Sequence, residues 1–126
     1  MIDEPYNAVV RENFAHPGHA GDVPDGAVGY FEDQGISIRL SAGVTGGVLE
    51  RLRFRAWGCP HVLAACEEFC RRYQGRPALD LEEFETARIM EDLAVPVEKT
   101  GRILVLEDTV RSLGQAIQDL TDTPQE

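Results

Sequence analysis

The chain has 126 residues and a mass of 13.9 kDa, with 12 basic and 22 acidic side chains that give a formal net charge of −10. This length suits one domain, residues 1–126, with a hydrophobic core of its own. The acidic balance excludes binding to a nucleic-acid backbone, which depends on basic charge. No apolar run reaches the roughly 18 residues of a membrane span, so we expect no membrane segment.

The cysteines and the first residues indicate the compartment. Residues 1–4 lack the basic and apolar regions of a secretory signal, so we expect a cytoplasmic protein. Thiols stay reduced there, and the three cysteines therefore do not predict a disulfide framework. Cys66 and Cys70 lie four residues apart on one predicted helix, and we expect both side chains to pack inward as small hydrophobic groups.

The first predicted element is a short helix over residues 3–14, with Asp3 as its cap. The proline and glycines of residues 16–21 end it. This loop contains His16 and His19, which we interpret as polar surface; metal ligation by the two histidines is the alternative.

Two strands follow a polar passage at residues 22–35. Residues 36–40 alternate between apolar and polar side chains, and residues 48–57 do the same, which is the pattern of strands with one buried face. The glycine-bearing loop at residues 42–47 predicts a hairpin, so these two strands should be antiparallel neighbours.

The second strand leads into a helix through a tight turn. Gly58 allows the backbone to bend, and Pro60 suits the first helical position, where its missing N–H costs nothing. Cys59 therefore lies at or beside a helix N-cap, where unpaired backbone N–H groups and the helix dipole favour a thiolate. We expect this helix to end at Gly75.

The rest of the chain is predicted to be mostly helical. Residues 80–89 have a capping-box pattern, residues 95–99 should be extended because of a proline, and Thr100 can cap a last helix that runs to about residue 120. The elements together predict an α+β fold: a small antiparallel sheet of about three strands packed against helices.

Positive charge is concentrated in the middle of the chain. Residues 51–76 contain six arginines against Glu67 and Glu68. This patch is a candidate docking surface for an acidic partner, and the alternative is a solvated strand face. The arginines are Arg51, Arg53, Arg55, Arg71, Arg72 and Arg76.

Four segments resemble the IscU/NifU-type iron–sulfur cluster scaffold family (NifU N-terminal-domain-like). Residues 11–21 are similar to the first segment of proteins in this family, where a short helix ends in an aromatic residue, Asn/His-Pro and Gly. Residues 54–59 resemble its Phe-x-x-aromatic-Gly-Cys motif, and residues 93–99 its Leu-Pro-Pro-Val-Lys segment. Residues 103–108 resemble the start of its long last helix. The resemblance covers about residues 6–120 and implies the SufE/IscU-like fold.

The resemblance also implies where ligands of a cluster or a zinc ion would lie. The family uses three cysteines, an aspartate two residues after the first and a histidine before the third. Cys59 matches the second cysteine. The first would fall near Glu32 and Asp33, the aspartate near Gln34, and Gly101-Arg102 replaces the histidine–cysteine pair. Of this ligand set the sequence keeps Cys59 alone.

A substitute site for an iron–sulfur cluster or zinc is one alternative. In it Cys59 and His61 would bind the metal together with Asp33 or Glu32. The competing interpretation places His61 in the first helical turn, facing solvent. Soft thiolates are the usual cluster ligands, and carboxylates do not readily replace them.

Three functions remain open at this point. In the first, the chain is a scaffold-like, non-enzymatic protein of iron–sulfur cluster assembly, and Cys59 receives sulfur from a cysteine desulfurase. In the second, it is an adaptor or regulator that keeps the fold and binds the desulfurase or other assembly proteins without holding a cluster. In the third, Cys59 and His61 act as nucleophile and base of a small thiol enzyme. Residues 95–99 have lost a proline and gained a negative charge relative to the family's chaperone-type segment, so we do not expect chaperone docking there.

Overall fold

The computed structural model describes residues 7–122. Three strands, four α-helices and two short 3-10 helices follow one another along this part of the chain. In order they are α1 (Ala8–Ala15), β1 (Ala27–Asp33), β2 (Ile36–Thr45), β3 (Val48–Trp57), α2 (Pro60–Tyr73), η1 (Ala78–Glu83), α3 (Thr86–Asp92), η2 (Val97–Lys99) and α4 (Thr100–Asp122).

The strands form one antiparallel sheet in the order β1-β2-β3, which confirms the predicted α+β class. Leu40 on β2 pairs with Gly29 on β1 and with Phe54 on β3, so these positions share one face of the sheet. The two strands expected from the sequence are both present. β1 was not among the predicted strands, because its segment reads as a polar passage.

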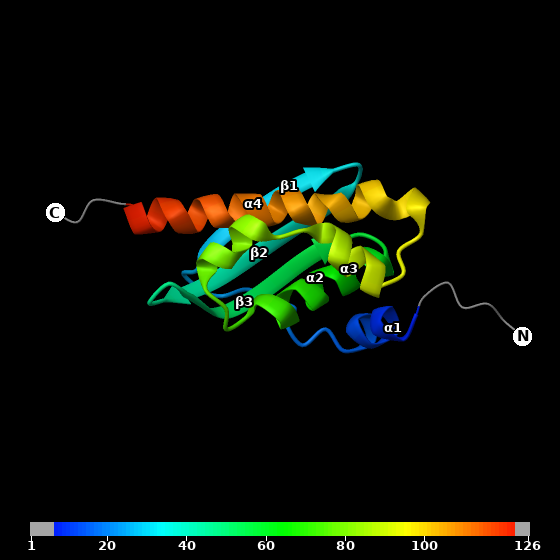
Figure 1. Ribbon diagram of the computed structural model, residues 1–126, viewed down its shortest axis with the longest axis horizontal. Helices are drawn as coiled ribbons and strands as arrows, with labels where there is room; N and C mark the ends of the chain where they lie inside the picture. Colours follow the sequence, from blue (N-terminus) through cyan, green and yellow to red (C-terminus); the bar gives the residue numbers. More distant parts are fainter. Residues whose placement is uncertain (1–6, 123–126) are drawn as a thin grey trace, which may run out of the picture.

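Helices cover one face of the sheet: α2 packs on β3, while α4 packs on β1 and β2 (Figure 1). Ile38, Leu40 and Leu52 on this face are fully buried. Gly29 allows α4 to approach β1 closely, because a Cβ added there would lie 2.3 Å from the backbone nitrogen of Leu113. A side chain on that residue would push the last helix off the sheet.

An arm of the chain before β1 covers the open edge of β3. The amide of Gly21 donates to the carbonyl of Phe54 (2.8 Å), and the amide of Phe54 donates to the carbonyl of His19 (2.9 Å). Asp22 then forms ion pairs with Arg55 at 2.5 Å and Arg39 at 3.3 Å. The arm thus satisfies backbone groups that an uncovered edge strand would expose.

The first helix begins later than predicted. Its N-cap is Asn7, whose side-chain oxygen accepts a hydrogen bond from the amide of Val10 (2.9 Å), and the Asn7 amide group donates to the carbonyl of Asp92 (2.9 Å). The proposed cap at Asp3 lies outside the described residues.

One predicted helix is two separate elements. The helix expected over residues 80–89 was wrong, because η1 ends before Phe84 and α3 begins only after Glu85, both of which are extended. Phe84 leaves the helical path to bury its ring against Phe69, with ring centroids 5.2 Å apart. Tertiary packing of one aromatic ring therefore overrides the local helical pattern.

The segment before the last helix was also predicted incorrectly in part. Pro96 is extended, as expected, but residues 97–99 form the short helix η2. Thr100 already has helical dihedral angles and lies inside α4, so it is not its cap. Within the described residues, we find no helix whose length and apolar character would let it span a bilayer.

Candidate functional site

Cys59 is the N-cap of α2, as the sequence predicts. Its backbone is extended (φ −78°, ψ 169°), Pro60 follows at the first helical position, and its carbonyl accepts from the amides of Val62 (2.9 Å) and Leu63 (3.2 Å). The side chain makes no capping hydrogen bond and is half-buried. The thiol is therefore held at the positive end of a helix without being used to stabilise that helix.

Gly58 sets the path of the chain into this cap. A Cβ added at Gly58 would lie 3.0 Å from Cβ of Val62, which is itself buried in the core. The close approach fixes the turn between β3 and the first residues of α2. The cysteine is placed by rigid elements on both sides.

Three chain segments meet at this end of the molecule. The turn between β1 and β2, the end of β3 and the start of α4 lie together on the right in Figure 1. Trp57 pairs with Ser37 at the start of β2, and a Cβ added at Gly101 would lie 3.9 Å from Nε2 of Gln34. The segments that the family resemblance singles out around residues 32–34 and 101–102 are thus neighbours in space.

The carboxylates of this end are engaged locally. The Tyr30 hydroxyl donates to Glu32 Oε2 (3.0 Å), and Gln34 Nε2 donates to Asp33 Oδ2 (3.2 Å). Both carboxylates are exposed. Among residues 7–122, no three or more His, Cys, Asp or Glu side chains are grouped so that they could hold a metal ion. Cys59, His61, Glu32 and Asp33 therefore do not form an assembled metal site.

His61 is buried, with 1% of its surface exposed, so the solvent-facing interpretation was wrong. Lys99 Nζ donates to His61 Nδ1 at 3.3 Å, which brings the end of η2 onto the first turn of α2. Burial, with the nearby Lys99 charge, lowers the pKa of His61. Its environment therefore favours a neutral imidazole that links two segments of the site.

The other two cysteines are inaccessible, as predicted. Cys66 and Cys70 have no exposed surface. Burial raises the pKa of both thiols, with smaller contributions from their neighbours. Among the three cysteines of the chain, Cys59 is the one whose sulfur can meet another molecule.

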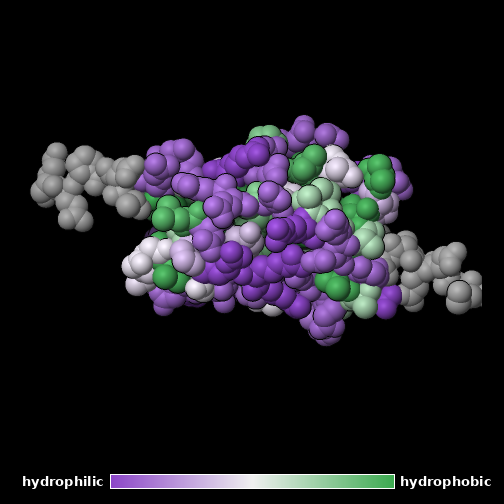
Figure 2. All heavy atoms as spheres, viewed as in Figure 1, coloured by the Kyte–Doolittle hydropathy of each residue, from purple (hydrophilic) through white to green (hydrophobic). Residues whose placement is uncertain are grey.

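Two large apolar side chains are exposed near the end of the molecule that holds Cys59. Trp57, two residues before it, is 76% exposed, and Val97 in η2 is 87% exposed. Figure 2 shows a largely hydrophilic face on which hydrophobic groups are scattered in small clusters. Large exposed apolar side chains beside a reactive group are typical of a surface that another protein covers.

Internal partners neutralise much of the predicted arginine patch. Arg55 pairs with Asp22, Arg71 with Glu67, Arg72 with Glu68 and Asp92, and Arg76 with Asp80. Arg53 donates to the carbonyl of Leu52 and to Gln74. Of the six arginines, Arg51 alone forms no hydrogen bond or ion pair with another described residue.

A buried ion network holds the loop that contains the two histidines and was missed from the sequence. Glu67 is fully buried; its carboxylate accepts from the amide of His19 (2.8 Å), from Nδ1 of His19 (2.6 Å) and from Nε of Arg71 (2.9 Å). The carbonyl of His16 accepts from Arg71 at 3.2 Å. These contacts fasten the edge-covering arm to α2, so His19 has a structural partner.

The fold, with a cysteine capping a helix at the end of a three-stranded antiparallel sheet, defines the SufE/IscU-like α+β class. No family model matches the sequence. The chain is 25% identical over 123 residues to "Iron sulfur cluster assembly protein 1, mitochondrial" of Eremothecium gossypii, covering 90% of this chain and 77% of that protein. It is 26% identical over 115 residues to "Iron-sulfur cluster assembly scaffold protein IscU" of Azotobacter vinelandii, covering 85% and 89%.

Solved structures share the architecture. The N-terminal NifU-like protein of Brucella abortus superposes with a TM-score of 0.72 at 13% identity, over 94% of this chain and 95% of that one. A SufU-type protein of Fervidobacterium islandicum gives a TM-score of 0.70 at 12% identity, over 86% and 96%. In sequence the chain is thus similar to iron–sulfur cluster assembly proteins, and in fold to NifU-like and SufU-type proteins.

Proposed function

We propose that this chain, acting as one domain over residues 1–126, is a scaffold-like, non-enzymatic protein of iron–sulfur cluster assembly. We propose that Cys59 is its sulfur acceptor and that a cysteine desulfurase is its partner. The names of the two relatives support the assembly role. The observation that carries the proposal is the half-buried thiol at the N-cap of α2, at the end of the molecule where the family's ligand segments meet.

The proposed step is a sulfur transfer. The sulfur of Cys59 attacks the terminal sulfur of a persulfide on the desulfurase, so a new sulfur–sulfur bond forms on Cys59 while the donor's sulfur–sulfur bond breaks. The donor leaves as a thiolate, and no external oxidant or reductant is consumed. The attacking sulfur lies at the positive end of the α2 dipole, which interacts favourably with negative charge that the transfer places there.

A complete cluster does not fit the side chains of this one chain. Clusters are held mainly by thiolates, and the two remaining thiols are buried in the core. The described residues also offer no group of three ligands. We therefore derive no step in which this chain alone holds a finished cluster.

The second candidate is an adaptor that binds a desulfurase or another assembly protein without receiving sulfur. The exposed Trp57 and Val97 favour it, because they offer a contact surface that does not depend on the thiol. The two candidates make different predictions for one variant, Cys59→Ala. Sulfur acceptance is lost in that variant, whereas adaptor binding remains.

The experiment combines the protein anaerobically with a cysteine desulfurase, cysteine and iron, and follows visible absorption and intact mass. We expect one added sulfur in the wild type and in the matched control Cys66→Ala, and none in Cys59→Ala. Trypsin leaves all three cysteines in one peptide, residues 56–71, so fragmentation within that peptide assigns the site. Desulfurase binding without any sulfur on Cys59 would favour the adaptor, and absence of both would reject both candidates.

The metal role of Cys59, His61, Asp33 and Glu32 stays a prediction, as does the cytoplasmic location. Metal content tests the first directly. These side chains are not assembled among the described residues, so a bound ion would have to draw the segments together, and zinc well below one per chain after purification would count against the metal role. A stoichiometric zinc that disappears in Cys59→Ala would show that the segments rearrange around the ion.

A further inference from the structure

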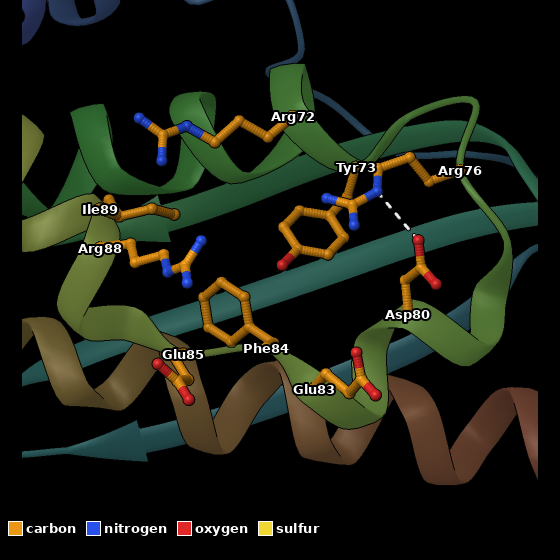
Figure 3. A pocket seen from close by; sticks show the side chains of 9 residues that line it. All are labelled: Arg72, Tyr73, Arg76, Asp80, Glu83, Phe84, Glu85, Arg88 and Ile89. Atoms are coloured by element: carbon orange, nitrogen blue, oxygen red, sulfur yellow. Dashed lines mark hydrogen bonds and ion pairs between the residues drawn. The ribbon is translucent and has the colours of Figure 1, made fainter.

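A second candidate site lies away from Cys59, between the end of α2, η1 and the start of α3. It is a cavity of about 510 Å³. Figure 3 shows side chains from these three elements around it, with Tyr73 above, Phe84 below and Arg88 entering from the side. The volume lies within the range of small-molecule pockets, which are about 300–1,000 Å³.

Two aromatic rings form a corner of this cavity. Tyr73 and Phe84 have ring centroids 5.6 Å apart at an interplanar angle of 77°. Phe69 supports both from the core, stacked on Tyr73 at 5.0 Å and edge-on to Phe84 at 5.2 Å. The corner is therefore rigid. Because Phe69 stacks on Tyr73 and Phe84 is only 9% exposed, the apolar surface that it offers to a ligand is small.

Two of the three arginines around the cavity are already occupied. Arg72 donates to Glu68 at 2.7 Å and to Asp92 at 2.5 Å. Arg76 lies 4.4 Å from the ring centroid of Tyr73 and donates to Asp80 at 3.0 Å. Both guanidinium groups are thus fixed parts of the wall.

Arg88 differs from them. It enters the cavity beside Phe84 (Figure 3), and it forms no hydrogen bond or ion pair with another residue in the described part of the chain. A guanidinium group presents paired N–H donors that match the two oxygens of a carboxylate. Its position beside an aromatic corner therefore suits an anion attached to an apolar body.

The surrounding charges select the kind of anion. Asp80, Glu83 and Glu85 also line the cavity, so the lining as a whole is not strongly positive. A dianion such as phosphate doubles both its repulsion from these carboxylates and its attraction to Arg88, and it has no apolar body to pack on the rings. A single carboxylate loses less to repulsion and gains the contact with the rings.

We propose that this cavity binds a small monocarboxylic acid with a flat aromatic or short apolar body, whose carboxylate is held by Arg88 and whose body packs on Phe84 and Tyr73. This site is separate from Cys59 and does not depend on the assembly role. Its ligand would meet the chain at the opposite end of α2.

The test uses phenylacetate as the probe and follows backbone amide signals of the ¹⁵N-labelled full chain. We expect saturable shifts of Tyr73, Phe84 and Ile89 at millimolar concentrations. Phenylacetamide, which lacks the charge, and inorganic phosphate should each bind at least about tenfold more weakly, because a charged hydrogen bond is lost or repulsion is added. Equal binding of either compound, or no saturable shift with phenylacetate, would overturn the proposal.

Variants assign the anion contact. Arg88→Gln should weaken phenylacetate binding about tenfold, and Arg88→Lys should recover part of the loss. The control Arg111→Gln removes an exposed arginine of α4 and should leave binding unchanged. The unperturbed signals of the core report that each variant is folded. Unchanged affinity in Arg88→Gln, or an equal loss in Arg111→Gln, would contradict the assignment.

Discussion

The two ends of α2 have opposite arrangements of polar groups. In its C-terminal half, Glu67 is fully buried and accepts three hydrogen bonds, and Glu68 is held by Asn13 and Arg72. At its N-terminus, Cys59 caps the helix with its backbone while its thiol makes no capping bond. One end is saturated with internal partners and holds the fold together. The other leaves a reactive atom open to another molecule, which is what a site of transfer or docking requires.

The largest effect in this comparison is expected at Glu67. Glu67→Ala removes the acceptor of two hydrogen bonds from His19 and one from Arg71, and should lower the free energy of unfolding by about 3 kcal/mol. Denaturant unfolding measures it. Arg111→Ala breaks only exposed ion pairs on α4 and should cost less than about 1 kcal/mol. Equal costs would mean that the buried network does not hold the arm.

A change of pH is expected to have an intermediate effect on the free energy of unfolding. Glu68 and His61, on different halves of α2, act in two different pH ranges. Burial opposes the charge of Glu68, but the hydrogen bonds from Asn13 and Arg72 outweigh it and lower its pKa below 4.5. As pH falls, the unfolded chain therefore takes up a proton at Glu68 before the folded chain does, and the free energy of unfolding decreases below about pH 4.5. Burial, helped by Lys99, lowers the pKa of His61 below 6.5. The unfolded chain therefore protonates His61 first, and the free energy of unfolding falls as pH drops below 6.5.

The variants Glu68→Gln and His61→Asn test this assignment. Glu68→Gln should flatten the pH dependence of stability only below about pH 4.5, and His61→Asn only in the window that starts at about pH 6.5, by at most about 1.4 kcal/mol per pH unit each. Unfolding midpoints measured across pH give both slopes. An unchanged slope in either variant contradicts its assignment.

The smallest effect on stability is expected at Cys59. Cys59→Ala should change the free energy of unfolding by less than about 1 kcal/mol, because the side chain is half-buried and makes no capping bond. Iodoacetamide should nevertheless modify Cys59 in the folded protein while Cys66 and Cys70 stay protected until unfolding. Rapid labelling of either buried cysteine under native conditions would show that α2 opens.

Local features were predictable from the sequence. The alternation in residues 48–57 and the Gly58 and Pro60 that flank Cys59 are short-range patterns, and the structure has the strand, the turn and the N-cap there. Features that depend on distant contacts were not. β1 contains Gly29, which reads as a strand breaker, yet α4 requires that glycine for its close approach.

The buried polar groups show the same limit. Glu67 looks like an ordinary surface charge in its helix, since its partner His19 lies 48 residues earlier in the sequence. His61 was expected to face solvent, because nothing local indicates that η2 would cover it. In the candidate site, the position of Cys59 followed from local rules, whereas its relation to Gln34, Lys99 and Gly101 required the fold.

The arm from His19 to Gly21 limits how a partner can attach. Many proteins recruit an extended peptide by adding it as a further strand to an exposed sheet edge. Here the amide and carbonyl of Phe54 already bond to the arm, and Glu67 anchors that arm to α2. Recruitment by sheet extension along β3 would first have to break a buried carboxylate network, so a partner gains more by contacting the loops around Trp57 and Val97.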